Sequence, residues 1–156
     1  MAESAGWSPA LDELIQRNDD AARAYINGEV DRFLDLVNPA DDYTLFTPFG
    51  GEAVSDMDRS EDAKRATAEF FQGGEAALEV AAAHKSGDLA VLIAIERQHG
   101  RVGGRDLPDC SLRVTLVFRH DDAGWRLLHR HADPLVHPID FDALVGLLGG
   151  AEPSGR

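Results

Sequence analysis

The first part of the chain has apolar residues at the three- and four-residue spacing of α-helices. Ser8-Pro9 is typical of a helix start, because serine caps free amide groups and proline fits the first turn. Apolar side chains then recur at helical spacing up to Ile26, and Asn27-Gly28 ends the pattern. A second, shorter helix is predicted over residues 30–37, before Asn38-Pro39 stops it.

The next stretch alternates between short elements and residues that break them. Residues 42–47 are predicted to form a strand, and the Pro-Phe-Gly-Gly that follows requires a loop. Asp58 and Glu61 have the spacing of a capping box, so a third helix is predicted to begin there. That helix is expected to extend through Phe71 and to end at Gly73-Gly74.

From residue 75 onward the hydrophobic period changes to two, as in β-strands. Turn sequences separate strand patterns at residues 75–85, 89–101, 111–120 and 125–133, with a longer connection at 102–108. Neighbouring strands joined by short turns favour an antiparallel meander. Because the helices come first and the strands afterwards, the sequence predicts an α+β fold in which N-terminal helices pack on a strongly curved, mostly antiparallel sheet.

The length of 156 residues suits one domain. We place this domain at residues 9–134, with flexible ends at 1–8 and 149–156, because both ends are rich in small, polar or Gly/Pro residues. Residues 135–148 form a C-terminal extension, in which the apolar residues between Phe141 and Leu148 predict a short helix.

Side chains alternate between the two faces of a strand, so the pattern predicts which face contacts the helices. Strand 111–120 should pack through Leu112, Val114, Leu116 and Phe118. Strand 89–96 has a fully apolar set that is expected against the helices, Leu89, Val91, Ile93 and Ile95, opposite Leu92, Ala94 and Glu96. In the last strand, alternation places Trp125, Leu127, His129, His131 and Asp133 on one face, and Arg126, Leu128, Arg130 and Ala132 on the other.

One group of polar side chains is the richest in chemistry: Glu96, Arg113, Thr115, His129, His131 and Asp133. Three interpretations are open. The first is a hydrogen-bonded polar ladder, exposed or within a dimer interface, and the second is the polar part of a ligand or active-site cavity. The third is a metal site. His129, His131 and Asp133 follow one another at intervals of two residues, so they share one face of the strand, and two imidazoles with a carboxylate can bind a divalent transition metal.

The formal net charge of −13 argues against nucleic acid or an anionic membrane as a partner, because phosphate contacts need clustered Lys and Arg. The excess acid is expected to serve solubility. The single cysteine, Cys110, cannot form an internal disulfide, and we expect it to have a packing role.

The sequence has neither a signal-peptide pattern nor an apolar run of membrane-spanning length, so a cytoplasmic protein is expected. Motifs for nucleotide binding, for zinc or for a nucleophilic serine are missing from the sequence. We therefore expect no cofactor and, on balance, no metal.

Several segments, in a fixed order, resemble the SnoaL-like branch of the nuclear-transport-factor-2-like superfamily. They are Asn27-Gly28-Glu29-Val30-Asp31, the stretch from Asp42 to Gly50, Ser86-Gly87-Asp88-Leu89-Ala90-Val91, and the ending from Arg113 to His131. The resemblance covers about Pro9 to Pro134. It implies a cone-shaped fold, with three helices over a strongly bent mixed sheet and a pocket between them, and it implies a homodimer.

Members of this superfamily include enzymes as well as binding and assembly domains, so the fold does not define a function. By this resemblance, the aspartate base of ketosteroid isomerases falls at Thr47, whose hydroxyl cannot act as a base without a partner. Their oxyanion-hole acid falls near Leu116, and their helix-borne tyrosine falls near Ala21, which leaves Tyr25 as the nearest phenol. The resemblance therefore implies that steroid isomerase chemistry is lost.

Epoxide hydrolases of this fold use an Arg-x-Asp motif on a strand. The segment Arg113-Val-Thr115 keeps the arginine of that motif but lacks its carboxylate.

The packing of the family implies that the helix-facing side of the sheet lines the cavity. The pocket candidates are then Tyr25, Phe46, Thr47, Phe49, Phe70, Ile93, Leu116, Leu128 and Arg130. Arg130 is the one clear charge among them and could hold a carboxylate or enolate oxygen, unless it points outward near a sheet edge. A β-bulge would swap the faces and bring Arg113, His131 and Asp133 inside instead.

Three functional hypotheses follow from these residues. The first is a homodimeric domain that binds a small apolar or aromatic ligand in an apolar pocket with one or two polar anchors. The second is a polyketide-cyclase-like or isomerase-like enzyme, in which His131 and Asp133 transfer protons and Arg113 stabilises an oxyanion. The third is a non-catalytic homodimerisation module whose polar face is structural.

Overall fold

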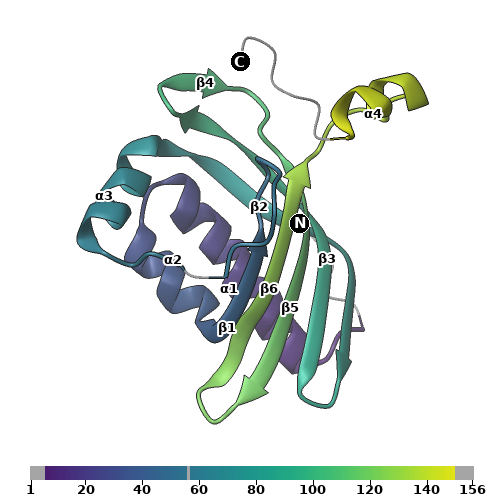
Figure 1. Cartoon of the computed structure of the whole chain (residues 1–156). Coiled ribbons are helices and arrows are strands. Elements are labelled where there is room, and N and C mark those ends of the chain that lie inside the picture. Colours follow the sequence, from purple (N-terminus) through teal and green to yellow (C-terminus); the bar gives the residue numbers. More distant parts are fainter. Residues whose placement is uncertain (1–5, 56, 150–156) are drawn as a thin grey trace.

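The computed structural model describes residues 6–55 and 57–149; the outermost residues of the two ends expected to be flexible, 1–5 and 150–156, lie outside this part. Its elements, in chain order, are α1 (Pro9–Ile26), α2 (Val30–Val37), β1 (Pro39–Phe46), α3 (Glu61–Phe70), β2 (Phe71–Ser86), β3 (Leu89–Val102), β4 (Arg105–Leu107), β5 (Leu112–Asp121), β6 (Gly124–Pro134) and α4 (Phe141–Leu147). The α+β class predicted from the sequence is confirmed, with helices α1, α2 and α3 on one side of a bent sheet (Figure 1).

The first two helices begin and end where the sequence predicts. The hydroxyl of Ser8 accepts a hydrogen bond from the Leu11 amide at 3.3 Å, which caps α1. Helix α2 ends at Val37 and is capped by Asn38, whose backbone adopts the left-handed conformation with φ of 48°. Asparagine tolerates this conformation better than most residues, so the chain can turn directly into β1.

The third helix differs from its prediction at both ends. Its cap is Ser60 rather than Asp58, because the Ser60 hydroxyl accepts the Ala63 amide at 3.1 Å. Helix α3 ends at Phe70, and β2 begins at the next residue, so Gly73-Gly74 lie inside a strand instead of closing the helix. Gly74 faces Gly100 of β3, and a Cβ atom at Gly74 would clash with the backbone of the opposite strand.

Within the described residues, the strands form one six-stranded sheet in the order β1-β6-β5-β3-β2, with β4 paired to β3. All neighbours are antiparallel except β1, which runs parallel to β6. Strand β1 starts at Pro39, three residues before its prediction, and the predicted connection at 102–108 contains β4. The Gly103-Gly104 turn produces this extra hairpin, because both glycines have positive φ.

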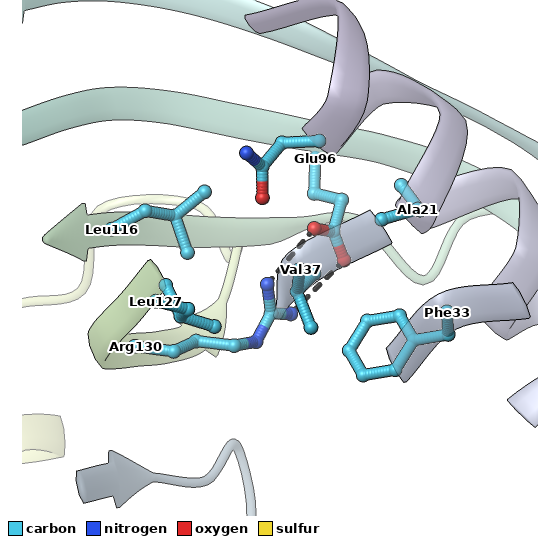
Figure 2. A pocket seen from close by; sticks show the side chains of 9 residues that line it. Ala21, Phe33, Val37, Glu96, Leu116, Leu127 and Arg130 are labelled. Carbon is cyan, nitrogen blue, oxygen red and sulfur yellow. Dashed lines mark hydrogen bonds and ion pairs between the residues drawn. The ribbon is translucent and has the colours of Figure 1, made fainter. Parts of the chain in front are cut away.

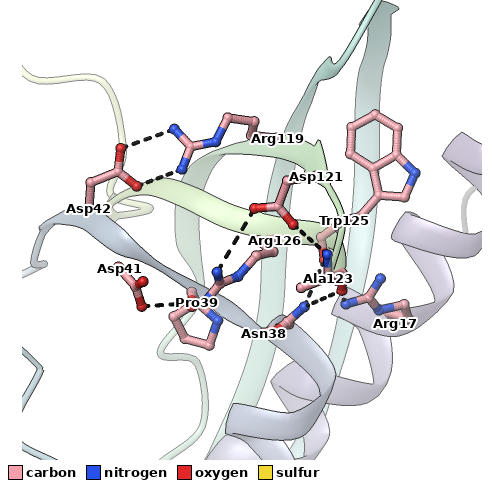
Figure 3. A network of polar contacts seen from close by, with 10 residues as sticks. All are labelled: Arg17, Asn38, Pro39, Asp41, Asp42, Arg119, Asp121, Ala123, Trp125 and Arg126. Carbon is pink, nitrogen blue, oxygen red and sulfur yellow. Dashed lines mark hydrogen bonds and ion pairs between the residues drawn. The ribbon is translucent and has the colours of Figure 1, made fainter.

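A network of arginines holds the parallel strand β1 against the β5–β6 hairpin (Figure 3). Arg126 donates to the Pro39 carbonyl at 2.7 Å, and Arg119 forms two hydrogen bonds with Asp42 at 2.7 and 3.0 Å. From α1, Arg17 donates to the Leu36 carbonyl of α2 at 2.8 and 3.0 Å and to the Trp125 carbonyl of β6 at 3.3 Å, which ties the segment before β1 to the hairpin. These contacts fix the parallel pairing beside an irregularity in the β1–β6 register.

The main core lies between α1 and the helix-facing side of the sheet, called the inner face below. Its largest fully buried side chains are Leu14, Leu92, Leu116, Phe118 and Leu127, whereas Ile26 is buried in a second, smaller cluster. Burial of each contributes about 1.5–3 kcal/mol. For β5 the predicted face is confirmed, since Val114, Leu116 and Phe118 are buried.

The face prediction for β3 is wrong. Ala90, Leu92 and Ala94 are buried on the inner face, whereas Leu89 and Ile93 are 47% and 41% exposed on the opposite, outer face. The reason is the register with β5, in which Leu92 pairs with Leu116. Paired residues of antiparallel strands share a face. Both faces of β3 are largely apolar, so its pairing with β5 determines which of them packs against the helices.

A β-bulge alters the face prediction for β6. Val117 pairs with His129 and Phe118 pairs with Leu127, which leaves Leu128 as the extra residue. Leu127, rather than Leu128, therefore enters the core and is 1% exposed. Beyond the bulge the prediction holds, with Arg130 and Ala132 inside.

Candidate functional site

A small cavity lies between α1, α2 and the inner face of the sheet (Figure 2). Its volume is about 10 Å³. A cavity of this size holds about one water molecule. It is lined by Asn18, Ala21, Ala22, Phe33, Val37, Glu96, Leu116, Leu127 and Arg130.

A buried ion pair forms the polar wall of this cavity. The two terminal nitrogens of Arg130 each donate to one carboxylate oxygen of Glu96, both at 3.1 Å, and Figure 2 shows the two side chains facing each other. The exposed fractions are only 18% for the Arg130 side chain and 9% for Glu96. Burial alone would lower the pKa of Arg130, but the adjacent Glu96 carboxylate raises it above its ordinary value.

Two tyrosines belong to the same polar environment. Tyr25 of α1 packs against Phe33 and Phe71, with ring centroids 4.7 and 4.5 Å apart. Burial raises the pKa of Tyr25, the charge of Arg130 opposes this change, and Glu96 adds to it. Burial likewise raises the pKa of Tyr43, again against the effect of Arg130. Both phenols therefore stay protonated at neutral pH and can donate hydrogen bonds.

Asn18 completes the polar lining. Its amide nitrogen donates to the Leu14 carbonyl at 2.8 Å, so its side-chain oxygen remains available as an acceptor. A guanidinium has five N–H donors, and the two bonds to Glu96 leave further donors on Arg130. The arrangement can therefore hold a small polar group, and an anion would compete with Glu96 for the arginine.

The outer face of the sheet carries a second candidate site, an open groove of about 320 Å³. Its polar edge is Asp133, whose Oδ2 atom lies 3.2 Å from His131 Nε2 and 3.6 Å from the Arg113 guanidinium. All three side chains are well exposed. The groove is lined by Ala81, Ile93, Ala94, Ile95, Arg113, Val114, Thr115, His131 and Asp133.

The nine predicted pocket residues do not meet in one place. Leu116 and Arg130 line the inner cavity, and Tyr25 lies close enough to Arg130 for the arginine charge to affect its pKa. Phe46 and Ile93 lie on the outer face instead, where the Phe46 ring contacts His131 at a centroid distance of 5.1 Å.

The other predicted pocket residues lie away from the cavity. Thr47 accepts the Phe49 amide within its own loop at 3.3 Å, and Phe49 is 89% exposed. Phe70 packs edge-on against Phe71 at the end of α3, and Leu128 is the extra residue of the bulge in β6.

The prediction from the sequence placed Glu96 in one polar group with residues such as Arg113 and His131, which is wrong. It did not identify Asn18 or Tyr43 as site residues. Glu96 shares the inner face with Leu92 and Ala94, not the outer face with Arg113 and His131. A signal for this site did exist, since Glu96 follows Leu92 and Ala94 on one face of its strand, and Arg130 lies between Leu128 and Ala132 on one face of another, so two opposite charges each accompany apolar residues. Recognising that the two charges meet requires the register of the strand between them.

The structure separates the three residues of the suggested metal site. His129 Nδ1 forms a hydrogen bond with Thr44 Oγ1 at 2.7 Å, whereas His131 turns to Asp133. No group of three His, Cys, Asp or Glu side chains in the described parts of the chain is placed to share a metal ion. Cys110 is half-buried beside α1, and burial raises the pKa of its thiol.

Comparison with known proteins identifies the family. The family model described as a SnoaL-like domain matches residues 14–136, so the chain belongs to the SnoaL-like domain family. This result confirms the resemblance noted in the sequence. A search of the curated proteins finds no match.

Solved structures share the fold at low sequence identity. An NTF2-like protein of unknown function from Pseudomonas putida has a TM-score of 0.62 and 20% identity, over 86% of this chain and 90% of that one. The CaMKII hub of S. rosetta has a TM-score of 0.60 and 20% identity, over 83% and 99%. A candidate ketosteroid isomerase from Shewanella frigidimarina has a TM-score of 0.60 and 17% identity, over 82% and 98%.

At such identities these neighbours show the fold alone, and their names span different activities. In the part of the chain that the structure describes, no helix is both long and apolar enough to cross a bilayer. The evidence on function therefore lies in the chemistry of the two sites.

Proposed function

We propose that this SnoaL-like domain binds a small molecule in the inner cavity and that Arg130 is the polar anchor for a carboxylate or enolate oxygen of that ligand. The observation that carries the proposal is the Arg130–Glu96 ion pair at the wall of the cavity. A buried ion pair contributes little to stability compared with apolar residues of similar size. If a ligand carboxylate replaces that of Glu96 at Arg130, the buried ion pair has a function in binding that offsets its small contribution to stability.

The groups near Arg130 suit a small aromatic or apolar acid. The protonated phenols of Tyr25 and Tyr43 supply donors, and Asn18 supplies an acceptor. Phe33 and Leu116 provide apolar contacts for the body of the ligand. Water is largely excluded at this depth, so each polar contact with the ligand is stronger than it would be at the surface.

The ligand needs more room than the present cavity offers, because small-molecule pockets usually have about 300 Å³ or more. Of the two helices at the cavity, α2 has one buried residue, Val37, whereas α1 has seven. The other contact of α2 with the cavity is the ring of Phe33. An outward shift of α2 would open the space above Arg130 while the sheet stays fixed.

The test compares benzoate with benzamide, which has a similar shape but no charge. We expect benzoate to raise the melting temperature and to give a calorimetric binding signal, and benzamide to give neither. The variant Arg130→Met/Glu96→Leu removes both charges together and should fold, but it should not respond to benzoate. Arg113→Gln on the outer face is the matched control and should bind as the unmodified chain does.

Other aromatic and aliphatic carboxylates extend the same comparison if benzoate has the wrong shape. Carboxylate binding that persists unchanged in the double variant would refute the role of Arg130. A chain that responds to no carboxylate, while its Arg113→Gln form behaves identically, would also count against the proposal.

A second candidate function rests on the outer groove. The His131 and Asp133 side chains lie 3.2 Å apart at the edge of a space large enough for a small substrate. This geometry suits an acid–base pair, with Arg113 beside it to stabilise a developing oxyanion. On this basis the domain would be an isomerase-like or cyclase-like enzyme.

The second function is tested by deuterium exchange at the α carbon of a cyclic ketone such as 2-tetralone, followed by NMR. His131→Ala should abolish any catalysed exchange and change the free energy of unfolding by less than about 1 kcal/mol. His129→Ala removes the imidazole two residues earlier on the same face and should leave the exchange rate unchanged. Equal rates in the two variants would exclude His131 as the base.

A further inference from the structure

The inner cavity has one positive and one negative group in its wall, and this balance limits which carboxylates can bind there. Of the residues that line the cavity, Arg130 and Glu96 are the two charged ones, and their charges cancel. The proposed function brings a further carboxylate into this space. A ligand with a carboxylate alone would add an excess negative charge at a buried position, which is unfavourable unless a positive group accompanies it.

Glu96 is the group that a simple acid would leave without a partner. The residue is only 7% exposed, and its carboxylate accepts one hydrogen bond from each terminal nitrogen of Arg130. If a ligand carboxylate replaces it at the arginine, Glu96 loses these bonds but stays away from water. A buried carboxylate without partners is strongly destabilising, so the ligand needs a donor of its own for Glu96.

Asn18 provides a second buried acceptor in the cavity wall. The residue is 5% exposed, and its amide nitrogen donates to the Leu14 carbonyl at 2.8 Å. The oxygen of the same amide group is left to accept a hydrogen bond from the occupant of the cavity. Two acceptors, one of them charged, suit an ammonium group, which has three donors and the positive charge that restores the balance.

The positions of the two charged residues limit the distance between the charges of the ligand. Arg130 and Glu96 are 3.1 Å apart at their nearest atoms. The group that binds the arginine and the group that binds the glutamate must therefore be close neighbours in the ligand. An α-amino acid has this arrangement, because its carboxylate and its ammonium group are attached to the same carbon atom.

From these observations we infer that the inner cavity selects apolar α-amino acids, and that Glu96 and Asn18 determine this selectivity. The inference rests on the proposed function and names its ligand class. The ligand carboxylate contacts Arg130, and its ammonium group donates to Glu96 and Asn18. The apolar lining contacts an aromatic or aliphatic side chain. With the ligand bound, the site contains two positive and two negative charges and stays neutral.

The test compares three ligands that share a phenylethyl body: phenylalanine, 3-phenylpropionate, which lacks the ammonium group, and 2-phenylethylamine, which lacks the carboxylate. Titration calorimetry of the full chain should show phenylalanine binding about 10- to 100-fold more tightly than either of the others, as expected for hydrogen bonds to charged groups. Leucine and 4-methylpentanoate repeat the comparison with an aliphatic body.

The variant Glu96→Gln keeps the shape of the side chain and removes its charge, so two of the ligands should respond in opposite directions. Phenylalanine should bind about 10-fold more weakly, because its ammonium group loses the opposite charge. The ligand 3-phenylpropionate should bind more tightly, because it no longer competes with a carboxylate for Arg130. A purely structural role for Glu96 would weaken both ligands alike. Glu79→Gln makes the same change at an exposed carboxylate and should leave both affinities unchanged.

The variant Asn18→Leu removes one acceptor and leaves the ion pair intact, so it carries the test if melting shows that Glu96→Gln does not fold. It should weaken phenylalanine about 10-fold and leave 3-phenylpropionate unchanged. Equal affinities of the unmodified chain for these two ligands would overturn the selectivity while carboxylate binding at Arg130 stands. Failure of all these ligands and of benzoate to bind would instead refute the proposed function, and the inference with it.

Discussion

Glu96 and Arg97 are neighbours on β3, and each forms an ion pair with a residue of another strand, but the two pairs lie in opposite environments. Glu96 meets Arg130 on the inner face with both side chains nearly buried, whereas Arg97 meets Glu79 on the outer face with both about half exposed. The shortest distances are almost equal, 3.1 and 3.0 Å. Distance alone therefore says little about what an ion pair does, and burial decides its energetic weight.

The same contrast separates the two sides of the sheet. The inner side encloses a cavity of about 10 Å³ around one buried ion pair, and the outer side offers a groove of about 320 Å³ with exposed charges. The polar groups of the inner site lie in a surrounding of low dielectric constant, but the cavity is too small in the present conformation to admit a ligand. The outer site is open to solvent. Water weakens the electrostatic interactions of its charged side chains until a partner or ligand covers them.

The largest expected effect is on the buried pair. Arg130→Met leaves the Glu96 carboxylate buried without a partner and should cost about 3–5 kcal/mol of unfolding free energy in urea. The double variant Arg130→Met/Glu96→Leu should recover much of that loss. Arg97→Met breaks the exposed pair on the next residue and should leave the urea midpoint unchanged. Similar losses for Arg130→Met and Arg97→Met would mean that burial does not distinguish the two pairs.

A second prediction tests the faces of β3 with two adjacent aliphatic residues. Leu92→Ala should cost about 2–5 kcal/mol, because Leu92 is fully buried and its removal leaves a cavity. Ile93→Ala on the outer face should cost less than about 1 kcal/mol. Both values come from urea unfolding of the same preparation. A larger loss for Ile93→Ala than for Leu92→Ala would reverse our assignment of the faces.

A third prediction uses the two tyrosines of the chain, both of which are buried and affected by the charge of Arg130. Burial raises the pKa of each phenol above its ordinary value of 10.0, so phenolate absorbance should develop at higher pH in the folded chain than in urea. The stability linked to them is fully present below pH 10 and is lost as the pH rises through the raised pKa values. Because the charge of Arg130 opposes the shift of Tyr43 and Glu96 has no part in it, Arg130→Met/Glu96→Leu should raise the pKa of Tyr43 further.

The smallest effect is expected in the exposed network around β1. Arg119 lowers the pKa of Asp42, so this contact adds stability above the pKa of the unfolded chain and loses it as the pH falls through the lowered value. Asp42→Asn should therefore lower the melting temperature slightly near neutral pH, and the difference should vanish in strong acid and shrink in salt. Asp41→Asn is the control, because the Asp41 carboxylate lies 3.6 Å from Arg126, farther than the 2.7 Å between Asp42 and Arg119, and should shift the melting temperature less. Equal shifts in melting temperature for the two variants would show that the Asp42–Arg119 contact contributes no more to stability than the Asp41–Arg126 contact.

Local chemistry was sufficient to predict most elements of this chain. Serine and proline at the start of α1, glycine after its end, and the alternation of β5 each act through neighbours close in sequence. The short strand β4 was missed because the Gly103-Gly104 turn is a hairpin signal only when a partner strand is present. The end of α3 was missed because the close approach of Gly74 to β3 is a contact across the sheet.

The candidate site was less accessible to prediction. Arg130 and Tyr25 were expected near a cavity, whereas Glu96 was assigned to the outer polar group and Phe46 to the inner one. Each of these assignments depends on how a strand pairs with its neighbour. A shift of one residue in pairing moves every side chain of a strand to the other face.

By itself, the sequence determined the order of helices and strands, the acidic character of the chain, the buried side of β5 and the membership in the SnoaL-like domain family. Only the tertiary structure decided that Glu96 and Arg130 meet inside, that Leu127 rather than Leu128 enters the core, and that the outer face holds a groove. Periodicity is a property of one segment, but register and the position of a bulge are set by contacts between segments far apart in the chain. The chemistry of this protein depends on those distant contacts.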